Sequence, residues 1–316
     1  MYDVIAIGEL LIDFAARSAD AEGYPTMKAN PGGAPGNFLA ALSRYGARTA
    51  FLGKVGDDAF GKLLLQTMQK AGIETRGILV DDSVFTTLAF VTFSPEGDRS
   101  FSFARKPGAD TQLAFEEIDC SMIDEASVFH FGTLSLTGEP VRTATKKCVE
   151  YAKSHGKLIT FDPNLRPPLW NTPEEAKQQI LWGLSMADVV KISDEEVEFL
   201  WGIADEKRAA EILLSEYGVR LAMITMGPRG AYLANQNGSA YAACPAVTPV
   251  DTTGAGDIFG GSAVSQLLQL HKAPEDLDGQ ELSCIGRFAC TAASLSTMKQ
   301  GGIPSIPDEQ DVADRM

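Results

Sequence analysis

Seven consecutive residues, Asp251-Thr252-Thr253-Gly254-Ala255-Gly256-Asp257, point most directly to the fold and chemistry of this 316-residue chain. An extended stretch, Ala246–Val250, precedes them, and a helical pattern, Ile258–Leu270, follows. Glycines let the backbone approach a ligand closely, and the free N–H groups at a helix start favour an anion. The stretch therefore predicts an anion hole for phosphate, formed by Gly254, Ala255 and Gly256.

Asp257 falls in the first turn of this predicted helix. A carboxylate there can accept a proton from a hydroxyl that attacks a phosphoryl group. For the motif alone, the alternative is structural: Asp257 complements the helix dipole and the glycines form a tight turn. A dinucleotide-binding loop does not fit, because G-x-G-x-x-G would need glycine where Phe259 stands. Neither Gly-Lys pair, at 53–54 or 61–62, is followed by serine or threonine, so a Walker A loop does not fit either.

Short apolar strands alternate with amphipathic helices along the rest of the chain. Strands are expected at 4–8, 49–55, 128–131, 158–161, 189–192 and 221–225, and helices at 35–45, 58–70, 139–154, 174–184, 207–217, 257–270 and 281–298, with a further helix beginning at Asp194. This alternation predicts one α/β domain over 1–316, with a central, mostly parallel sheet flanked by helices. Two β-rich runs, 86–93 and 99–105, flank 94–98 and predict a hairpin. Together with 13–28, this hairpin would form a small sheet outside the main one.

A second glycine-rich segment, Asn30–Asn37, also precedes a predicted helix. Gly32 and Gly33 can bring bare backbone against a small polar ligand, and Asn37 offers both a donor and an acceptor. Asp13, which follows the first strand, can accept hydrogen bonds from sugar hydroxyls. An ordinary loop and a plain turn are the alternatives for these residues.

Three more segments follow predicted strands, at the edge of an α/β sheet where ligands bind. They are Asp162–Arg166, Lys191–Glu196 and Thr225–Gly230. Arg166 can neutralise phosphate charge or hydrogen-bond substrate oxygens. Ser193-x-x-Glu196 fits a capping box, and Glu196 can also help hold Mg²⁺ through its water shell. A surface loop, a helix cap and a bare turn are the structural alternatives.

The overall charge limits the classes of partner. The chain has 42 acidic and 27 basic residues, a net charge of -15, which disfavours general binding to nucleic acids or to membrane surfaces. Its five cysteines include no C-x-x-C pair, a pattern typical of the reducing cytosol. Neither a signal peptide nor an apolar run long enough to span a bilayer is visible in the sequence, so a cytoplasmic protein is expected.

Taken together, these segments resemble those of the ribokinase-like (PfkB) carbohydrate kinases, and the resemblance covers essentially the whole chain. The two signatures are Gly32–Asn37 and Asp251–Asp257. Within the family, the Gly-Gly-Ala-Pro form of the first signature, Asp162–Arg166 and Lys191–Ser193 are most like those of the bacterial fructokinases. Ser193 departs from the family pattern, which usually has asparagine there.

The resemblance implies a ribokinase-like fold with a small β lid, from about 13–28 and 86–105, that closes over the sugar. It also implies Asp257 as the catalytic base. The other roles that it implies are sugar contacts at Asp13, Gly32, Gly33, Asn37, Phe103, Arg166 and Asp257; nucleotide contacts at Asn164, Lys191, Thr225, Gly227, Gly230, Gly254 and Gly256; water-mediated Mg²⁺ at Glu196; and a monovalent cation at Asp251 and Thr253. The implied cofactors are ATP, Mg²⁺ and K⁺ or another monovalent cation, and family lids can pair into a homodimer.

The implied reaction is transfer of the γ-phosphoryl group of ATP to the primary hydroxyl of fructose, giving fructose 6-phosphate. A related kinase acting on 2-keto-3-deoxygluconate, ribose or a nucleoside is one alternative. For an acidic sugar, Arg105 and Arg166 could together clamp the carboxylate. A catalytically inactive sugar-binding regulator is a second alternative, and a dinucleotide-dependent oxidoreductase, disfavoured by the motif, is a third.

Overall fold

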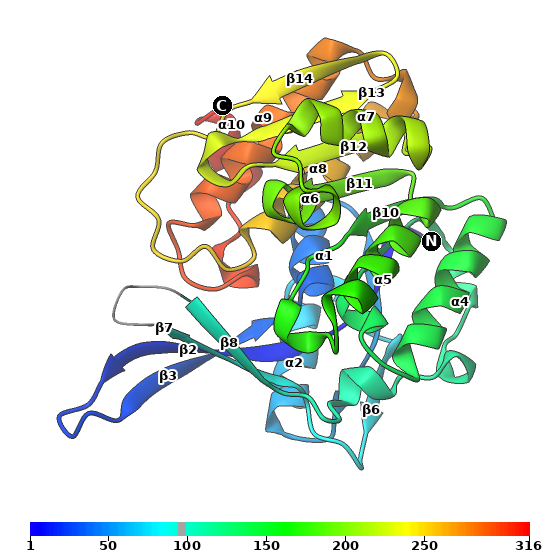
Figure 1. Ribbon diagram of the computed structural model, residues 1–316. Helices are drawn as coiled ribbons and strands as arrows, with labels where there is room; N and C mark the ends of the chain where they lie inside the picture. The colour runs from blue at the N-terminus through cyan, green and yellow to red at the C-terminus, as the bar shows by residue number, and fades with distance from the viewer. Residues whose placement is uncertain (94–98) are drawn as a thin grey trace.

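A ten-stranded sheet of apolar segments forms the centre of the fold (Figure 1). The computed structural model describes residues 1–93 and 99–316. The strand order is β14-β13-β12-β11-β10-β9-β1-β4-β5, and β6 also pairs with β4. Pairing is parallel everywhere except between β12 and β13 and between β13 and β14. The predicted α/β fold with a mostly parallel sheet is therefore confirmed.

The elements follow the predicted alternation closely. The strands of the main sheet are β1 Tyr2–Ile7, β4 Thr49–Gly56, β5 Ile73–Glu74, β6 Ile78–Asp81, β9 Ala126–Gly132, β10 Leu158–Asp162, β11 Val189–Ser193, β12 Leu221–Thr225, β13 Ala231–Asn235 and β14 Gly238–Ala242. The longer helices are α1 Ala34–Arg44, α2 Ala59–Lys70, α4 Val141–Ser154, α5 Pro173–Met186, α6 Asp194–Trp201, α7 Glu206–Glu216, α8 Ala255–Leu270 and α9 Gly279–Ser296. The β13–β14 hairpin was not predicted, and residues 246–250, expected to be extended, join neither sheet.

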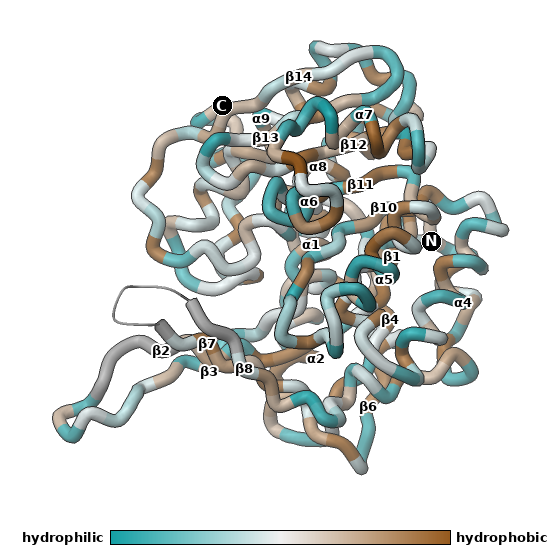
Figure 2. Tube along the Cα trace, in the orientation of Figure 1, coloured by the Kyte–Doolittle hydropathy of each residue, from teal (hydrophilic) through white to brown (hydrophobic). Residues whose placement is uncertain are grey.

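Helices cover both faces of the main sheet, because the central strands are apolar on both sides. Along β1, Ile5 and Ile7 belong to a core that also contains side chains of α4, α5, α6 and α7, whereas Val4 and Ala6 belong to a core that contains side chains of α1, α2 and α8. Successive side chains of a strand point to opposite faces, so the residues of β1 contribute alternately to two cores, one on each face of the sheet. Figure 2 shows the matching pattern on α4, where hydrophobic and hydrophilic residues alternate along the tube.

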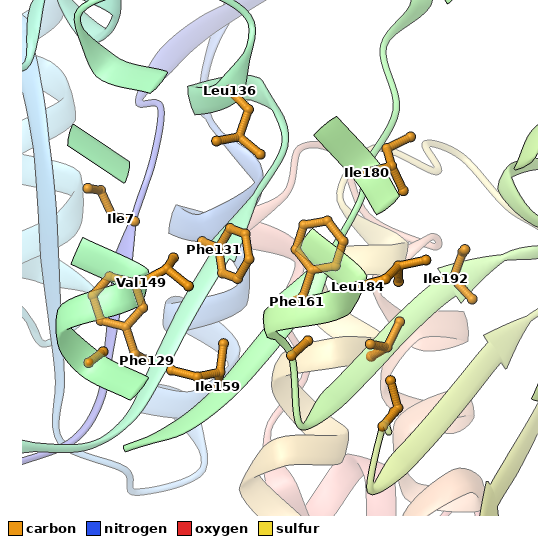
Figure 3. Close-up of a cluster of buried hydrophobic side chains, with 14 of the residues drawn as sticks. Ile7, Phe129, Phe131, Leu136, Val149, Ile159, Phe161, Ile180, Leu184 and Ile192 are labelled. Atoms are coloured by element: carbon orange, nitrogen blue, oxygen red, sulfur yellow. The ribbon is translucent and has the colours of Figure 1, made fainter. Parts of the chain in front are cut away.

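The larger core gathers aromatic side chains at the middle of the sheet (Figure 3). The rings of Phe131 on β9 and Phe161 on β10 lie 4.6 Å apart between centroids. A Cβ atom added to Gly183 on α5 would lie 2.4 Å from Cζ of Phe161. Helix α5 therefore packs directly onto the Phe161 ring, and this contact fixes the end of β10 that leads into the loop after it.

A second, four-stranded sheet is formed by segments that are distant in sequence. Its order is β3-β2-β7-β8, with β2 Leu11–Ala19, β3 Pro25–Gly32, β7 Leu88–Phe93 and β8 Arg99–Ala104. Figure 1 shows it set apart from the main sheet, on the side of α1 and α2. The separate small sheet is thus confirmed, although Asn30–Gly32, expected as loop, belong to β3. The predicted hairpin turn at 94–98 lies outside the described residues.

In the part of the chain that the structure describes, no helix is both long and apolar enough to cross a bilayer.

Replacing Phe161 with alanine should lower the free energy of unfolding by about 3–5 kcal/mol, because a buried ring is lost and a cavity remains. Urea titration followed by circular dichroism measures this change. The control is Tyr24→Ala, since Tyr24 is 69% exposed and should matter by less than about 0.5 kcal/mol. Equal effects of the two substitutions would contradict the role given to Phe161.

Candidate active site

The start of α8 has glycine at positions where a side chain would lie too close to neighbouring residues. Gly254 caps the helix with φ 77°, in the left-handed region. A Cβ atom there would lie 3.0 Å from Nδ2 of Asn37 and 3.1 Å from Cα of Gly302. Glycine therefore serves both the turn and the close approach of α1 to this helix start. The N–H of Ala255 donates to the carbonyl of Thr252 at 3.3 Å, and an anion at this helix start would meet the positive end of the helix dipole.

Asp257, in the first turn of α8, is held from two sides. Nδ2 of Asn37 donates to Oδ2 of Asp257 at 2.8 Å, and Nδ2 of Asn164 donates to Oδ1 at 3.1 Å. Asn37 belongs to α1 and Asn164 to the loop after β10. Burial raises the pKa of Asp257, while the hydrogen bond from Asn37 opposes that rise. The structure thus brings together three residues from separate sequence motifs.

A cavity of about 140 Å³ opens beside Asp257. Its lining joins the main body to the small sheet and consists of Glu9, Leu11, Asp13, Gly33, Ala34, Asn37, Val91, Phe103, Leu134, Asn164, Arg166, Thr252, Thr253, Gly254 and Asp257. All predicted sugar contacts are in this set except Gly32. A Cβ atom on Gly32 would lie 2.3 Å from Oδ2 of Asp13, so this glycine makes room for that carboxylate.

Acidic groups dominate the polar lining of the cavity. Burial raises the pKa of Asp13 to about 7, although the positive charge of Arg166 opposes it. Burial likewise raises the pKa of Glu9 to about 7. Oε1 of Glu9 accepts a hydrogen bond from the backbone N–H of Ala34 at 2.8 Å, at the start of α1. The sequence analysis missed Glu9, whose signal is an acidic residue directly after a buried strand.

Arg105 is already engaged inside the protein. Its guanidinium lies 2.6 Å from Oδ2 of Asp110, and it also donates to Oγ1 of Thr137 and the carbonyl of Leu134. Its side chain is only 4% exposed, and Arg105 does not line the cavity. The expected clamp of Arg105 and Arg166 on an acidic sugar is therefore wrong, because Arg105 serves to hold the segment after β8 to the body.

A buried ion pair supports the loop after β10. Nζ of Lys191 lies 3.0 Å from Oδ2 of Asp162, and both side chains are at most 10% exposed. Burial raises the pKa of Asp162 to about 6, with Lys191 opposing. A Cβ atom on Gly256 would lie 3.0 Å from Nζ of Lys191, so this pair lies directly against the anion hole. Asp162 was not predicted as a site residue, because its partner, Lys191, is 29 positions away on the neighbouring strand.

The residues expected at the nucleotide fall into two places. Asn164 and Gly254 line the cavity, next to Asp257. Thr225 lies opposite Ser193 at the carboxyl ends of β12 and β11, outside that lining. The glycines at 227 and 230 follow Thr225, with φ of 54° and 104°. A Cβ atom on the second would lie 2.0 Å from the carbonyl oxygen of residue 242, so a side chain is excluded there.

The residues expected near cations are fixed by backbone donors. Oε1 of Glu196 accepts from the N–H of Leu165 and Oε2 from that of Ser193, each at 2.8 Å. Oδ1 of Asp251 accepts from N and Oγ1 of Thr253, and Oδ2 accepts from the N–H of Gly301. The capping box at 193–196 is fully formed. Among residues 1–93 and 99–316, no three acidic, histidine or cysteine side chains gather to hold a metal ion.

These features form one arrangement at the carboxyl edge of the sheet: an anion hole at a helix start, a carboxylate clamped beside it, and a small polar cavity closed by a second sheet. The family model described as pfkB family carbohydrate kinase matches residues 1–309. The chain belongs to this family. The predicted resemblance and the carbohydrate kinase activity are thereby confirmed.

Individual members of the pfkB family are similar over nearly the whole length. Fructokinase-1 from Zea mays is 41% identical over 98% of this chain and 96% of its own. A fructokinase from Xylella fastidiosa, solved with bound ATP, has a TM-score of 0.88 and 29% identity, covering 99% of this chain and 98% of its own. A double mutant of the fructokinase from Vibrio cholerae O395, solved with fructose, ADP and potassium ion bound, has a TM-score of 0.86 and 27% identity, with the same coverage.

Replacing Gly33 with alanine should disrupt the sugar side of this pfkB kinase. Gly33 has φ 117°, and a Cβ atom would lie 2.3 Å from the carbonyl oxygen of Glu9. We expect kcat/KM for the sugar to fall at least tenfold and the melting temperature to fall by several degrees. The matched control is Gly23→Ala, at φ 89° with nothing within 4 Å of the added atom. If both variants behave alike, the close approach at Gly33 does not matter.

Proposed function

We propose that this pfkB kinase transfers the γ-phosphoryl group of ATP to the primary hydroxyl of fructose, giving fructose 6-phosphate. The observation that carries the proposal is the Asp257 carboxylate, buried at the start of α8, clamped by two amides and facing a cavity of about 140 Å³. The fructokinases among its relatives support fructose as the acceptor.

In the proposed reaction, Asp257 accepts the proton of the attacking sugar hydroxyl as the new phosphate ester bond forms. The backbone N–H groups of residues 254–256 receive the negative charge of the transferring phosphoryl group. Because phosphoryl transfer passes through a loose transition state, orientation and charge stabilisation contribute more than the strength of the base. A carboxylate that cannot rotate and a preformed anion hole meet both needs.

The polar groups of the cavity favour a neutral polyol over an acidic sugar. Asp13 and Asp257 offer acceptors for hydroxyl hydrogens, and Oδ1 of Asn37 is a buried acceptor without a protein partner in the described residues. Arg166 is the cationic side chain of the lining, and it lies in the field of Asp13 and Asp257. A sugar carboxylate would lie beside these acidic groups, with Arg166 as its cationic partner among the lining residues. Fructose has no such charge, so it suits the cavity better than 2-keto-3-deoxygluconate.

Mg²⁺ fits this site as a companion of the nucleotide. Each oxygen of Glu196 accepts one backbone N–H and keeps a lone pair for a metal-bound water, as the hydrated Mg²⁺ ion requires. When bound with ATP, Mg²⁺ neutralises phosphate charge. Asp251 and the hydroxyl of Thr253 supply oxygen atoms suited to a monovalent cation such as K⁺. The adenosine part of ATP would lie along Thr225, Gly227 and Gly230.

Three further parts of the proposal concern the molecule as a whole. The small sheet acts as a lid: residues Asp13 and Phe103 of its strands line the sugar cavity, so its closure over the sugar would exclude water. A homodimer through this lid, and a cytoplasmic location, stay predictions from the sequence. Size-exclusion chromatography with light scattering tests the first, and cell fractionation the second.

Asp257→Asn should leave the fold intact and lower kcat by about 10²–10⁴-fold, because the amide cannot accept the hydroxyl proton. Steady-state kinetics with a coupled ADP assay measures the loss, and circular dichroism checks the fold. Asp311→Asn, an exposed carboxylate in the first turn of α10 Glu309–Ala313, is the matched control and should keep full activity. A variant at 257 within threefold of the wild type would remove Asp257 from the mechanism.

A panel of acceptors tests the substrate directly. We expect kcat/KM for fructose to exceed that for 2-keto-3-deoxygluconate by at least tenfold, given the acidic lining of the cavity. It should also exceed the values for ribose and adenosine, because the similar relatives are fructokinases. The same coupled ADP assay serves for all four. A preference for the acidic sugar would overturn the electrostatic argument, and no ADP formation with any acceptor would favour the inactive regulator instead.

A further inference from the structure

We propose that Asn164 is a positioning residue, which fixes the orientation of the Asp257 carboxylate, and that Glu196 holds Asn164 in place through the backbone of the loop after β10. This inference rests on the proposed role of Asp257 as the base. It gives Asn164 a task on the sugar side of the site, distinct from the nucleotide contact expected from the sequence.

The backbone of Asn164 adopts an unfavourable conformation. Its φ is 44°, in the left-handed region that residues other than glycine avoid. Such a conformation persists only where the surroundings impose it. Asparagine tolerates it better than most residues do. The side chain is also buried, at 8% exposure. A strained, buried amide points to a positioning task rather than to an ordinary turn.

Three hydrogen bonds impose this conformation. The N–H of Asn164 donates to Oδ1 of Asp162 at 3.1 Å, and the ion pair with Lys191 holds Asp162 in turn. The hydroxyl of Thr133 donates to the carbonyl of residue 163. The N–H of Leu165 donates to Oε1 of Glu196 at 2.8 Å. The residues on both sides of Asn164 are therefore fixed, which leaves its amide aimed at Asp257.

Glu196 reaches this loop from the start of a different helix. Its second oxygen accepts from the N–H of Ser193, so the carboxylate joins the start of α6 to the loop after β10. Any shift of Glu196, including one caused by the charges of a bound nucleotide, would move the N–H of Leu165 and with it Asn164. The nucleotide side and the base are thus connected by two hydrogen bonds and one residue of backbone.

The amide of Asn164 has two effects on Asp257. With Asn37 on Oδ2 and Asn164 on Oδ1, rotation of the carboxylate would break one of the two hydrogen bonds. A donor to the ionised form also lowers the pKa of a carboxylate, which counteracts the rise caused by burial. Losing Asn164 should therefore misorient the base and raise its pKa together.

The test uses Asn164→Gly, because glycine accepts a φ of 44° and so removes the amide without straining the backbone. We expect kcat to fall about 10–100-fold while KM for fructose stays within threefold. The acidic limb of the kcat–pH profile should move up by about one pH unit, since the ionised form of Asp257 loses a donor. The matched control is Asn171→Gly, which removes an exposed amide that donates to Oε2 of Glu175 at 2.9 Å. It should change neither kcat nor the profile.

Two more variants keep the proposal open to refutation. Asn164→Asp tolerates the same backbone conformation and places a second carboxylate against Asp257. It should therefore move the acidic limb of the kcat–pH profile to a still higher pH. This variant replaces Asn164→Gly if Asn164→Gly melts below the assay temperature. Glu196→Gln is followed by kcat rather than by the pH profile, because removing the charge of Glu196 itself lowers the pKa of Asp257 and opposes the effect of a displaced Asn164. In the double variant Asn164→Gly/Glu196→Gln, the loss in kcat should be smaller than the product of the single losses, because the part of the Glu196→Gln loss that acts through Asn164 is already present in Asn164→Gly, whereas any loss from weaker Mg²⁺ binding is unaffected by position 164.

The outcomes separate this inference from the proposed function. If Asp257→Asn stays active, the base itself is wrongly assigned and the proposed mechanism falls. If Asp257→Asn is inactive while Asn164→Gly matches Asn171→Gly in kcat and in pH profile, the proposed function stands and the positioning role of Asn164 is overturned. Fully multiplicative losses in the double variant would overturn the link through Glu196 alone.

Discussion

Burying the ionisable carboxylate of Asp257 is the constraint on which the rest of the site depends. Removing a carboxylate from water is costly unless hydrogen bonds replace the lost solvation. Here the replacement comes from Asn37 and Asn164, which lie 220 and 93 residues away in the chain. The starts of α1 and α8 and the loop after β10 must therefore converge on one point. The loop after β10 lies at the carboxyl edge of the parallel sheet, where ligands bind in such folds, and the starts of α1 and α8 reach the same edge from outside the sheet.

Close packing of α1 against α8 is the second requirement, and it explains why α8 has glycine at positions 254 and 261. A Cβ atom on Gly261 of α8 would lie 2.4 Å from the carbonyl oxygen of Phe38 on α1. About two turns of helix earlier, Gly254 approaches Asn37 in the same way. The two helices can thus lie near enough for a short asparagine side chain to reach Asp257. A larger residue at Gly261 would move α1 away and break the clamp before any catalytic residue changed.

The sequence predicted those parts of the molecule that are encoded locally. The alternation of strands and helices and the glycine-rich start of α8 depend on neighbouring residues, and each is found as expected. The strands of the small sheet were also predicted from local β-rich patterns, although they pair across segments that are distant in sequence. The Asp162–Lys191 pair and the contact of Glu9 with the start of α1 were missed, because each joins residues about 25–30 positions apart. Arg105 was misjudged for the same reason: nothing near it in sequence reveals that Leu134 and Thr137 occupy its donors.

The net charge of -15 does not decide which ligands the site accepts; the local arrangement of charged and polar groups does. A surface so acidic repels polyanions at long range, yet salt screens that repulsion beyond about 8–10 Å. At short range the two ends of the site differ in sign. The sugar end carries the carboxylates of Glu9, Asp13 and Asp257, which suit a neutral polyol, whereas the start of α8 presents backbone N–H groups, which suit phosphate. Because the phosphate donors are backbone groups, the site can accept a triphosphate without a basic surface.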